Sequence, residues 1–194
     1  MRADVPVAGS FRDPSGFLFT RDGRLYRQIN TVYRENYERL MGSGLYQALV
    51  DAGSLLAHRE VEIEPAEPSP AYKVIEPEII PFVSYPYEWS FGQLRDAALL
   101  TLQIQKLALA RDLSLKDSSA YNIQFRGCRP ALIDTLSFEV YREGEPWVAY
   151  RQFCQHFLAP LALMSHRDVR LSQLLRVYID GVPLDLASAL LPRR

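Results

Sequence analysis

Two aspartates and an asparagine, in a loop after a predicted helix and at the end of a predicted hairpin, most constrain how this chain can fold. Asp117 and Asn122 lie five positions apart in the loop, and Asp134 follows twelve positions later, at the end of the hairpin. Apolar side chains recur on one helical face over 91–112, which predicts a long helix, and alternation within 123–134 predicts two short strands around a Gly-containing turn. We therefore expect the hairpin to end beside the loop, which brings Asp134 close to Asp117 and Asn122.

These three side chains suit phosphoryl-transfer chemistry. In such a site one carboxylate orients the attacking hydroxyl, here Asp117, while an amide oxygen and a second carboxylate bind Mg²⁺, here Asn122 and Asp134. Mg²⁺ prefers hard oxygen ligands, which these groups supply. The alternative is an ordinary polar loop, because Asp and Asn both favour turns.

The first part of the chain is predicted to be rich in strands. Segments 16–20 and 25–29 flank Asp22-Gly23, a dipeptide that favours the tight turn of a hairpin. Weaker patterns predict a helix from about residue 31, a short helix within 43–52, and strands over 61–63, 72–75 and 79–83.

The second part is predicted to be mostly helical, so we expect an α+β fold that divides near residue 86. Residues 1–86 would form a small antiparallel sheet with one or two helices, and residues 87–194 a mostly helical lobe. Helices are expected over 145–161, 172–178 and 184–191, with Pro160 ending or kinking the first of them.

Composition limits the function classes. The chain has 194 residues, 48% of them hydrophobic, and a formal net charge of -1, which argues against a general nucleic-acid binder. Its two cysteines form no metal-binding or disulfide pattern, and no apolar run is long enough to cross a membrane. We therefore expect a cytoplasmic protein with neither a nucleic-acid nor a membrane partner, and histidines at the surface or the edge of the core.

Longer segments resemble known families. Segments 115–125 and 132–138 are similar to the catalytic and metal-binding segments of kinase-like phosphotransferases, including the aminoglycoside phosphotransferases. Segments 10–17, 25–29, 81–90 and 147–154 resemble the N-terminal region of bacterial, nodulation-related proteins classed as class I SAM-dependent methyltransferases. The resemblance implies a reduced protein-kinase-like fold of two lobes, with SAM bound only by a downstream domain outside this chain.

Carried over to this sequence, the resemblance makes Asp117 the catalytic base and Asn122 and Asp134 the ligands of Mg²⁺, bound together with ATP or another nucleotide. Leu115 stands where such loops usually have a histidine, and no Gly-rich phosphate-binding motif is present. Arg27 replaces the usual phosphate-pairing lysine, and these two cations are not equivalent.

Three further residues are candidates for the nucleotide-binding site. Glu38 could pair with Arg27, or could be an ordinary surface charge. Tyr85 and Tyr87 lie in the linker 84–90, where they would wall the adenine pocket or simply pack in the interface between lobes.

Two functions follow from these residues and from the resemblance. The first is a kinase-like domain that binds a Mg-nucleotide or a phosphorylated compound, with phosphotransfer to a small-molecule substrate. The second is a catalytically inert accessory module that binds substrate or partner for a fused or separate methyltransferase domain.

Overall fold

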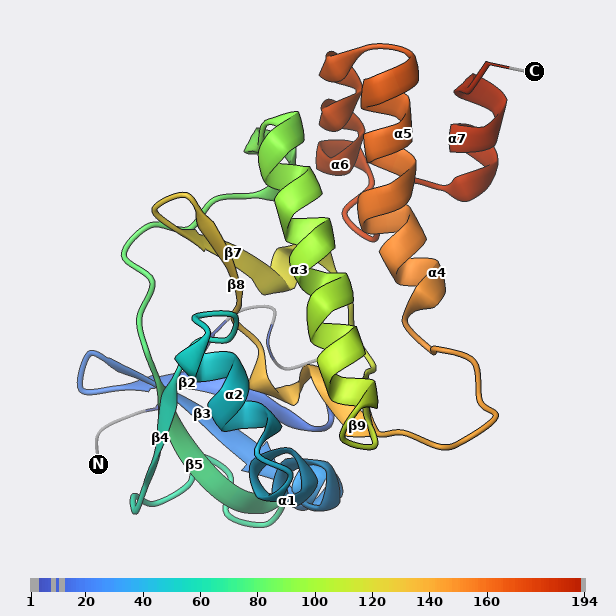
Figure 1. Ribbon diagram of the computed structural model, residues 1–194. Helices are drawn as coiled ribbons and strands as arrows, with labels where there is room; N and C mark the ends of the chain where they lie inside the picture. Colours follow the sequence, from blue (N-terminus) through green and yellow to red (C-terminus); the bar gives the residue numbers. More distant parts are fainter. Residues whose placement is uncertain (1–3, 8–9, 11–12, 193–194) are drawn as a thin grey trace.

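The computed structural model describes residues 4–7, 10 and 13–192, and it has the predicted α+β architecture. A small antiparallel sheet and two short helices form the first part of the chain, and a mostly helical part follows (Figure 1). The long helix α3, Phe91–Leu109, runs between the sheet and the helices of the C-terminal part (Figure 1).

The sheet has five strands in the order β1-β2-β3-β5-β4, and all neighbours are antiparallel. Its strands are β1 (Val5–Pro6), β2 (Gly16–Arg21), β3 (Arg24–Asn30), β4 (His58–Val61) and β5 (Ala71–Pro77). The predicted β2–β3 hairpin is confirmed. Asp22 and Gly23 have φ of 53° and 75°, as a tight turn between twisted strands requires.

Two helices follow the hairpin, as predicted. They are α1 (Arg34–Gly42) and α2 (Leu45–Asp51), and Gly44 between them has φ of 73°. The strand predicted at 61–63 lies three residues earlier, as β4. The strand predicted at 79–83 is wrong, because that segment forms bends without sheet pairing.

The helix α3 begins with reciprocal hydrogen bonds. Ser90 Oγ accepts from the Gln93 amide at 3.2 Å, and the Gln93 side chain accepts from the Ser90 amide at 3.0 Å. After α3 the chain forms two small antiparallel pairs. They are β6 (Leu113–Leu115) with β9 (Phe138–Val140), and β7 (Ile123–Arg126) with β8 (Arg129–Leu132).

The predicted helix does not end at Pro160, but a π-helical turn interrupts it directly before this residue. The elements are α4 (Tyr150–Phe153), the π-helical turn (Cys154–Leu158), α5 (Ala159–His166), α6 (Leu174–Val177) and α7 (Leu184–Leu190). Within the π-helical turn the Ala159 amide donates to the Cys154 carbonyl, five residues earlier. Pro160 has no N–H to donate to the next carbonyl, that of Gln155, which accepts from the Val182 amide at 2.9 Å instead.

The largest hydrophobic cluster is shared by both parts of the chain. Leu40 and Leu49 of the first part pack in the same cluster as Leu94 and Phe157 of the second. Backbone hydrogen bonds connect the parts as well. The amide of Leu56 donates to the Leu132 carbonyl at 2.9 Å, and the Leu132 amide donates to Ser54 at 2.9 Å.

None of the helices in the described part of the chain combines the length and apolar character that crossing a membrane would require.

His58 is half-buried at the edge of the core, so it is not the surface residue that its charged neighbours suggest. Its Nε2 lies 2.9 Å from the Tyr37 hydroxyl, and its ring centroid lies 4.5 Å from that of Tyr46. Burial lowers the pKa of His58 to about 4. The polar neighbours Arg59 and Glu60 gave the misleading signal in the sequence.

Candidate functional site

A cavity of about 980 Å³ lies where the sheet meets the loops on either side of β7 and β8. Four of the seven candidate residues line it, namely Arg27, Asp117, Asn122 and Asp134. Its wall has a polar region formed by these residues and an apolar region. The apolar wall includes Leu18, Leu25, Leu56, Ile75, Ile79, Ile80 and Val83.

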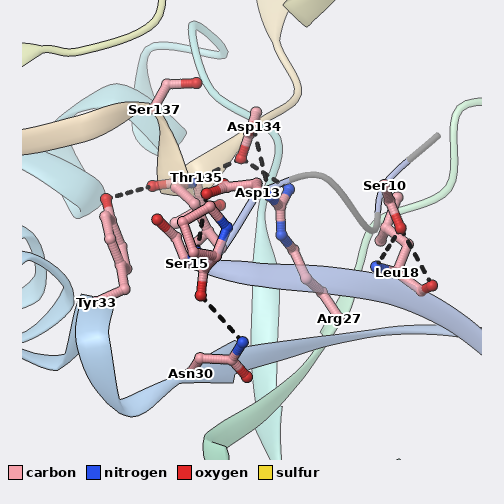
Figure 2. Close-up of polar contacts among 12 residues, drawn as sticks. Ser10, Asp13, Ser15, Leu18, Arg27, Asn30, Tyr33, Asp134, Thr135 and Ser137 are labelled. Atoms are coloured by element: carbon pink, nitrogen blue, oxygen red, sulfur yellow. Dashed lines mark hydrogen bonds and ion pairs between the residues drawn. The ribbon is translucent and has the colours of Figure 1, made fainter. Parts of the chain in front are cut away.

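Asp134 and Arg27 form an ion pair at the polar end of the cavity. Arg27 Nη1 lies 2.7 Å from Asp134 Oδ1, and the Arg27 side chain is 13% exposed. Asp134 Oδ1 also accepts from the Leu136 amide at 2.7 Å, which fixes the carboxylate at the start of the turn 135–137. Figure 2 shows Arg27 reaching from its strand toward Asp134 and Asp13.

Asp13 is a second carboxylate near this guanidinium. Its Oδ2 lies 3.9 Å from Arg27 Nη2, and its Oδ1 accepts from the Ser15 amide at 2.8 Å. Within the described residues, the buried Nε of Arg27 has no hydrogen-bond partner. An unpaired buried donor is costly, so this N–H is ready to bind an acceptor atom.

Asp117 lies at the start of a tightly held loop. Its Oδ1 accepts from the Ser119 amide at 2.9 Å. The next residue, Ser118, donates its amide to Gln152 Oε1 at 2.7 Å and its hydroxyl to the Ala149 carbonyl at 2.8 Å. These contacts fix the loop against the start of α4. They brace it at a site where the usual bracing histidine is replaced by Leu115.

Asn122 ends the same loop and is joined to the segment that leads to Asp134. Its backbone carbonyl accepts from the Ile133 amide at 2.8 Å. Its side-chain nitrogen lies 3.4 Å from Ser137 Oγ, which leaves the amide oxygen of Asn122 available to a ligand.

A segment before β2 borders the cavity, although the sequence has no Gly-rich motif. Val7, Ser10 and Asp13 line the cavity, and the Ser10 hydroxyl accepts from the Leu18 amide at 2.8 Å. The structure thus places a segment of the chain beside the cavity that no sequence motif announced. Residues 8–9 and 11–12 of this segment lie outside the described residues.

Lys116 is a site residue that sequence reasoning missed. Its Nζ donates to Ser15 Oγ at 2.7 Å and lies 4.8 Å from the centre of the Tyr33 ring. It also lines the cavity, next to Asp117. Its position next to Asp117 in the sequence could have identified Lys116 as a site residue. Gln152, which also lines the cavity, lies too far away in the sequence for a local pattern to identify it.

Glu38 does not belong to this site, which corrects that candidate. Its Oε1 lies 2.9 Å from Arg34 Nε, one helical turn away, and accepts from the Tyr72 hydroxyl at 2.8 Å. Among the described residues, Arg27 pairs with carboxylates outside α1. Glu38 is thus the surface charge that the sequence left open as the alternative.

Tyr85 and Tyr87 do not line the cavity, so their placement as its walls is also corrected. The two rings stack on each other with centroids 5.4 Å apart. Trp89, in the same linker, is buried in the large core cluster and packs against Phe125. Packing in the linker is the better description of these aromatic residues.

The linker backbone is already hydrogen-bonded at Ser84. Gln124 accepts from the Ser84 amide at 2.9 Å and donates to the Ser84 carbonyl at 3.0 Å. By contrast, residues 79–83 make no hydrogen bonds within the described structure, and Ile79, Ile80 and Val83 border the cavity. Free backbone groups for a ligand therefore lie before Ser84.

His156 is buried close to the Asp117 loop, with its ring edge-on to Tyr121 at 6.2 Å. Its Nδ1 has no partner among the described residues, and burial lowers the pKa of this histidine. It is not at the surface, and it does not line the cavity.

The donor set supplies part of a magnesium coordination shell, and water or a ligand would supply the remaining oxygens. No group of three His, Cys, Asp or Glu side chains suited to a metal occurs among the residues described. Asn122 and Asp134 offer two hard oxygen ligands, and Mg²⁺ is commonly bound by one or two carboxylates together with phosphates and water. Among the described residues of the lining, carboxylates outnumber cations, four (Asp13, Glu78, Asp117 and Asp134) against two (Arg27 and Lys116).

No protein-family model matches the chain. The chain is similar to the nodulation protein NoeA of Rhizobium meliloti (strain 1021), with 40% identity over 187 residues. The match covers 91% of this chain and 37% of NoeA, so the chain spans little more than a third of the length of this curated relative. This similarity supports the nodulation-related part of the resemblance that the sequence suggested.

Proposed function

We propose that the cavity binds a nucleotide or another phosphorylated small molecule together with Mg²⁺, in a kinase-like domain. The observation that carries the proposal is the position of Arg27, Asp117, Asn122 and Asp134 around one cavity. Three of these residues come from a stretch of 18 positions, but Arg27 comes from the distant strand β3. Their meeting at one site makes an ordinary polar loop a poor explanation.

The order of elements supports the kinase-like interpretation. Asp117 follows β6, Asn122 precedes β7, and Asp134 stands between β8 and β9. Pairing of β6 with β9 brings the chain just before Asp117 next to the chain just after Asp134, and β6 also contacts α3. A protein kinase arranges its catalytic base and metal ligands on the same order of helix, loop and hairpin.

The cavity offers different surroundings to the two ends of a nucleotide. Phosphate oxygens would bind near Arg27 Nε and Lys116 Nζ, since both groups donate hydrogen bonds and carry positive charge. The base would lie against the apolar wall, with the free backbone of residues 79–83 in reach of its polar edge. This places the base contacts before Ser84 and away from Tyr85 and Tyr87.

Asn122 and Asp134 would hold the Mg²⁺, which when bound neutralises phosphate charge. Asp117 would orient a hydroxyl of an acceptor and take its proton, because its carboxylate lines the cavity at the start of the braced loop. In this assignment Asp117 is needed for phosphotransfer but contributes little to nucleotide binding.

A second candidate function is a catalytically inert accessory module of a methyltransferase. It is favoured by the Arg27–Asp134 ion pair, which engages the carboxylate that would bind metal. It is also favoured by the NoeA match, in which the chain covers 37% of a longer protein. Such a module would use the same cavity to hold a substrate or partner without phosphotransfer.

Thermal unfolding with ATP, GTP or ADP, each with and without Mg²⁺, tests binding. A ligand at about 100 times its Kd adds roughly 2.7 kcal/mol of stability. Asp134→Asn keeps an oxygen for the Leu136 amide but loses the charge, so it should lose the magnesium-dependent part of the shift. Asp96→Asn, at a partly exposed position of α3 outside the cavity lining, is the control and should behave as the wild type.

Phosphate turnover separates the two candidate functions. Asp117→Asn should retain the nucleotide-induced shift and lose turnover if the domain is a phosphotransferase. Binding without turnover in the wild type would favour the accessory module. No shift with any nucleotide or phosphorylated compound would refute the proposed function of this cavity.

A further inference from the structure

We infer that Arg27 is a resident counter-ion that competes with the metal for Asp134 and transfers to Asp13 when a divalent cation binds. The inference rests on the proposed function, in that Asn122 and Asp134 are taken as the cation ligands. It adds a regulatory role to that site, because the same arginine would link metal binding to the segment before β2.

The competition follows from the ion pair. Arg27 Nη1 lies 2.7 Å from Asp134 Oδ1, and Nη2 lies 3.4 Å from Asp134 Oδ2. A guanidinium in this position neutralises the carboxylate and repels a second cation. A divalent ion at Asp134 is therefore opposed until Arg27 moves away.

A second carboxylate is already within reach of the same guanidinium. Arg27 Nη2 is 3.9 Å from Asp13 Oδ2, so a small rotation of the side chain would exchange one partner for the other. Asp134 retains the Leu136 amide on Oδ1 throughout, which keeps its carboxylate in place. Oδ2 accepts a long hydrogen bond from Arg27 Nη2, with no other partner among the described residues, and is the oxygen that becomes free.

The unpaired Nε of Arg27 indicates that the observed pairing leaves the side chain incompletely satisfied. This N–H is buried and has no partner in the described part of the chain. A shift toward Asp13 would turn the guanidinium and let Nε meet a ligand oxygen or water. The ion pair with Asp134 is thus not the only good position for Arg27.

Asp13 is held in a position where it can receive the guanidinium. Its Oδ1 accepts from the Ser15 amide at 2.8 Å, which leaves Oδ2 facing Arg27. Ser15 in turn accepts from Lys116 at 2.7 Å. Transfer would therefore replace the Arg27–Asp134 ion pair by an Arg27–Asp13 ion pair without a rearrangement around Asp13.

Mn²⁺ alone, followed by electron paramagnetic resonance, measures cation binding without any nucleotide or turnover. Removing the competing charge in Arg27→Gln should tighten Mn²⁺ binding by about tenfold or more. Arg24→Gln, on the same strand but exposed and 4.0 Å from Glu76, is the matched control and should leave the affinity unchanged. Equal or weaker binding to Arg27→Gln would overturn the inference.

Asp13→Asn tests the transfer with a variant at a partly exposed position that keeps an oxygen for the Ser15 amide. It should weaken Mn²⁺ binding in the wild-type background, because Arg27 then has no second partner. The same substitution should have no effect in an Arg27→Gln background. An undiminished effect there would mean that Asp13 acts on the metal directly, which would also overturn the inference.

The outcomes separate this inference from the proposed function. Tighter Mn²⁺ binding to Arg27→Gln, with no response of any variant to nucleotides, would support the counter-ion role and refute nucleotide binding. Nucleotide binding, together with Mn²⁺ affinities that do not depend on Arg27, would support the proposed function and refute the counter-ion role.

Discussion

Lys116 Nζ donates to Ser15 Oγ at 2.7 Å, which joins two residues 101 positions apart at the edge of the cavity. Ser15 is itself buried, and its carbonyl accepts from the Asn30 amide at 2.8 Å. The segment before β2 is therefore attached both to the sheet and to the loop that carries Asp117.

Replacing Lys116 by Met should loosen this segment. The substitution keeps much of the side-chain volume but removes the charged donor, and such hydrogen bonds contribute about 1.5–3 kcal/mol. We expect the amides of residues 13–18 to exchange hydrogen about tenfold faster, measured by mass spectrometry. Lys106→Met, at an exposed position of α3, is the control, and equal exchange in both variants would contradict the prediction.

Replacing Gly181 by Ala should destabilise the C-terminal part of the protein by about 2 to 4 kcal/mol. Gly181 has φ of 93°, and an added Cβ would lie 2.6 Å from Gln155 Cβ and 2.9 Å from the Gln155 carbonyl carbon. The free energy of unfolding in urea measures the loss.

Gly144→Ala is the matched control for Gly181. Gly144 also has a positive φ, 85°, but nothing lies within 4 Å of an added Cβ. There the substitution should cost only about 1 kcal/mol of unfolding free energy, because alanine disfavours a positive φ. Equal losses in the two variants would mean that the contact with the π-helical turn has no energetic role.

Gln152 should be needed to hold the loop that begins at Asp117. Gln152→Leu leaves the Ser118 amide without its acceptor, which costs about 1–3 kcal/mol when the group is buried. Gln152→Glu retains an acceptor oxygen and should restore protection of the Ser118 amide in hydrogen exchange. Failure of the Glu variant to restore protection would indicate that Gln152 acts through packing alone.

Stability should fall in acid because of His58. The folded-state pKa of about 4 lies below the ordinary value of 6.5, so the unfolded state takes up the proton first as the pH drops. This contribution is fully present above pH 6.5 and is lost as the pH falls from there toward 4. Between pH 7.5 and pH 5 the loss amounts to about 2 kcal/mol.

His58→Gln should remove this part of the pH dependence of the unfolding free energy. His166→Gln, at an exposed position, should retain the wild-type dependence. The attribution to His58 fails if both variants lose stability equally between pH 7.5 and pH 5 in urea titrations.

Local patterns predicted the elements that local interactions determine. The Asp22-Gly23 hairpin and the helix after Ser90 carry their own turn and capping signals, and both were correct. The grouping of Asp117, Asn122 and Asp134 was also predicted, because a short hairpin joins them.

The elements that were missed depend on distant partners. β1 has two residues and exists through its pairing with β2, which no short pattern announces. Residues 79–83 are a short apolar run that resembles a strand, but they pair with no strand of the described structure. The π-helical turn before Pro160 also depends on a distant partner. The Val182 amide donates a hydrogen bond to the Gln155 carbonyl of this turn.

Two backbone hydrogen bonds at Leu132, described above as a link between the parts of the chain, bear on how a ligand reaches the cavity. Ser54 and Leu56 bond to β8 only two residues before Asp134, while the linker joins the same two parts at a separate place. The two parts of the chain are thus held together at two separate places, which restricts hinge motion of one part relative to the other. A ligand would have to enter a cavity whose walls are largely formed before it arrives, without a large movement between the sheet and the helices.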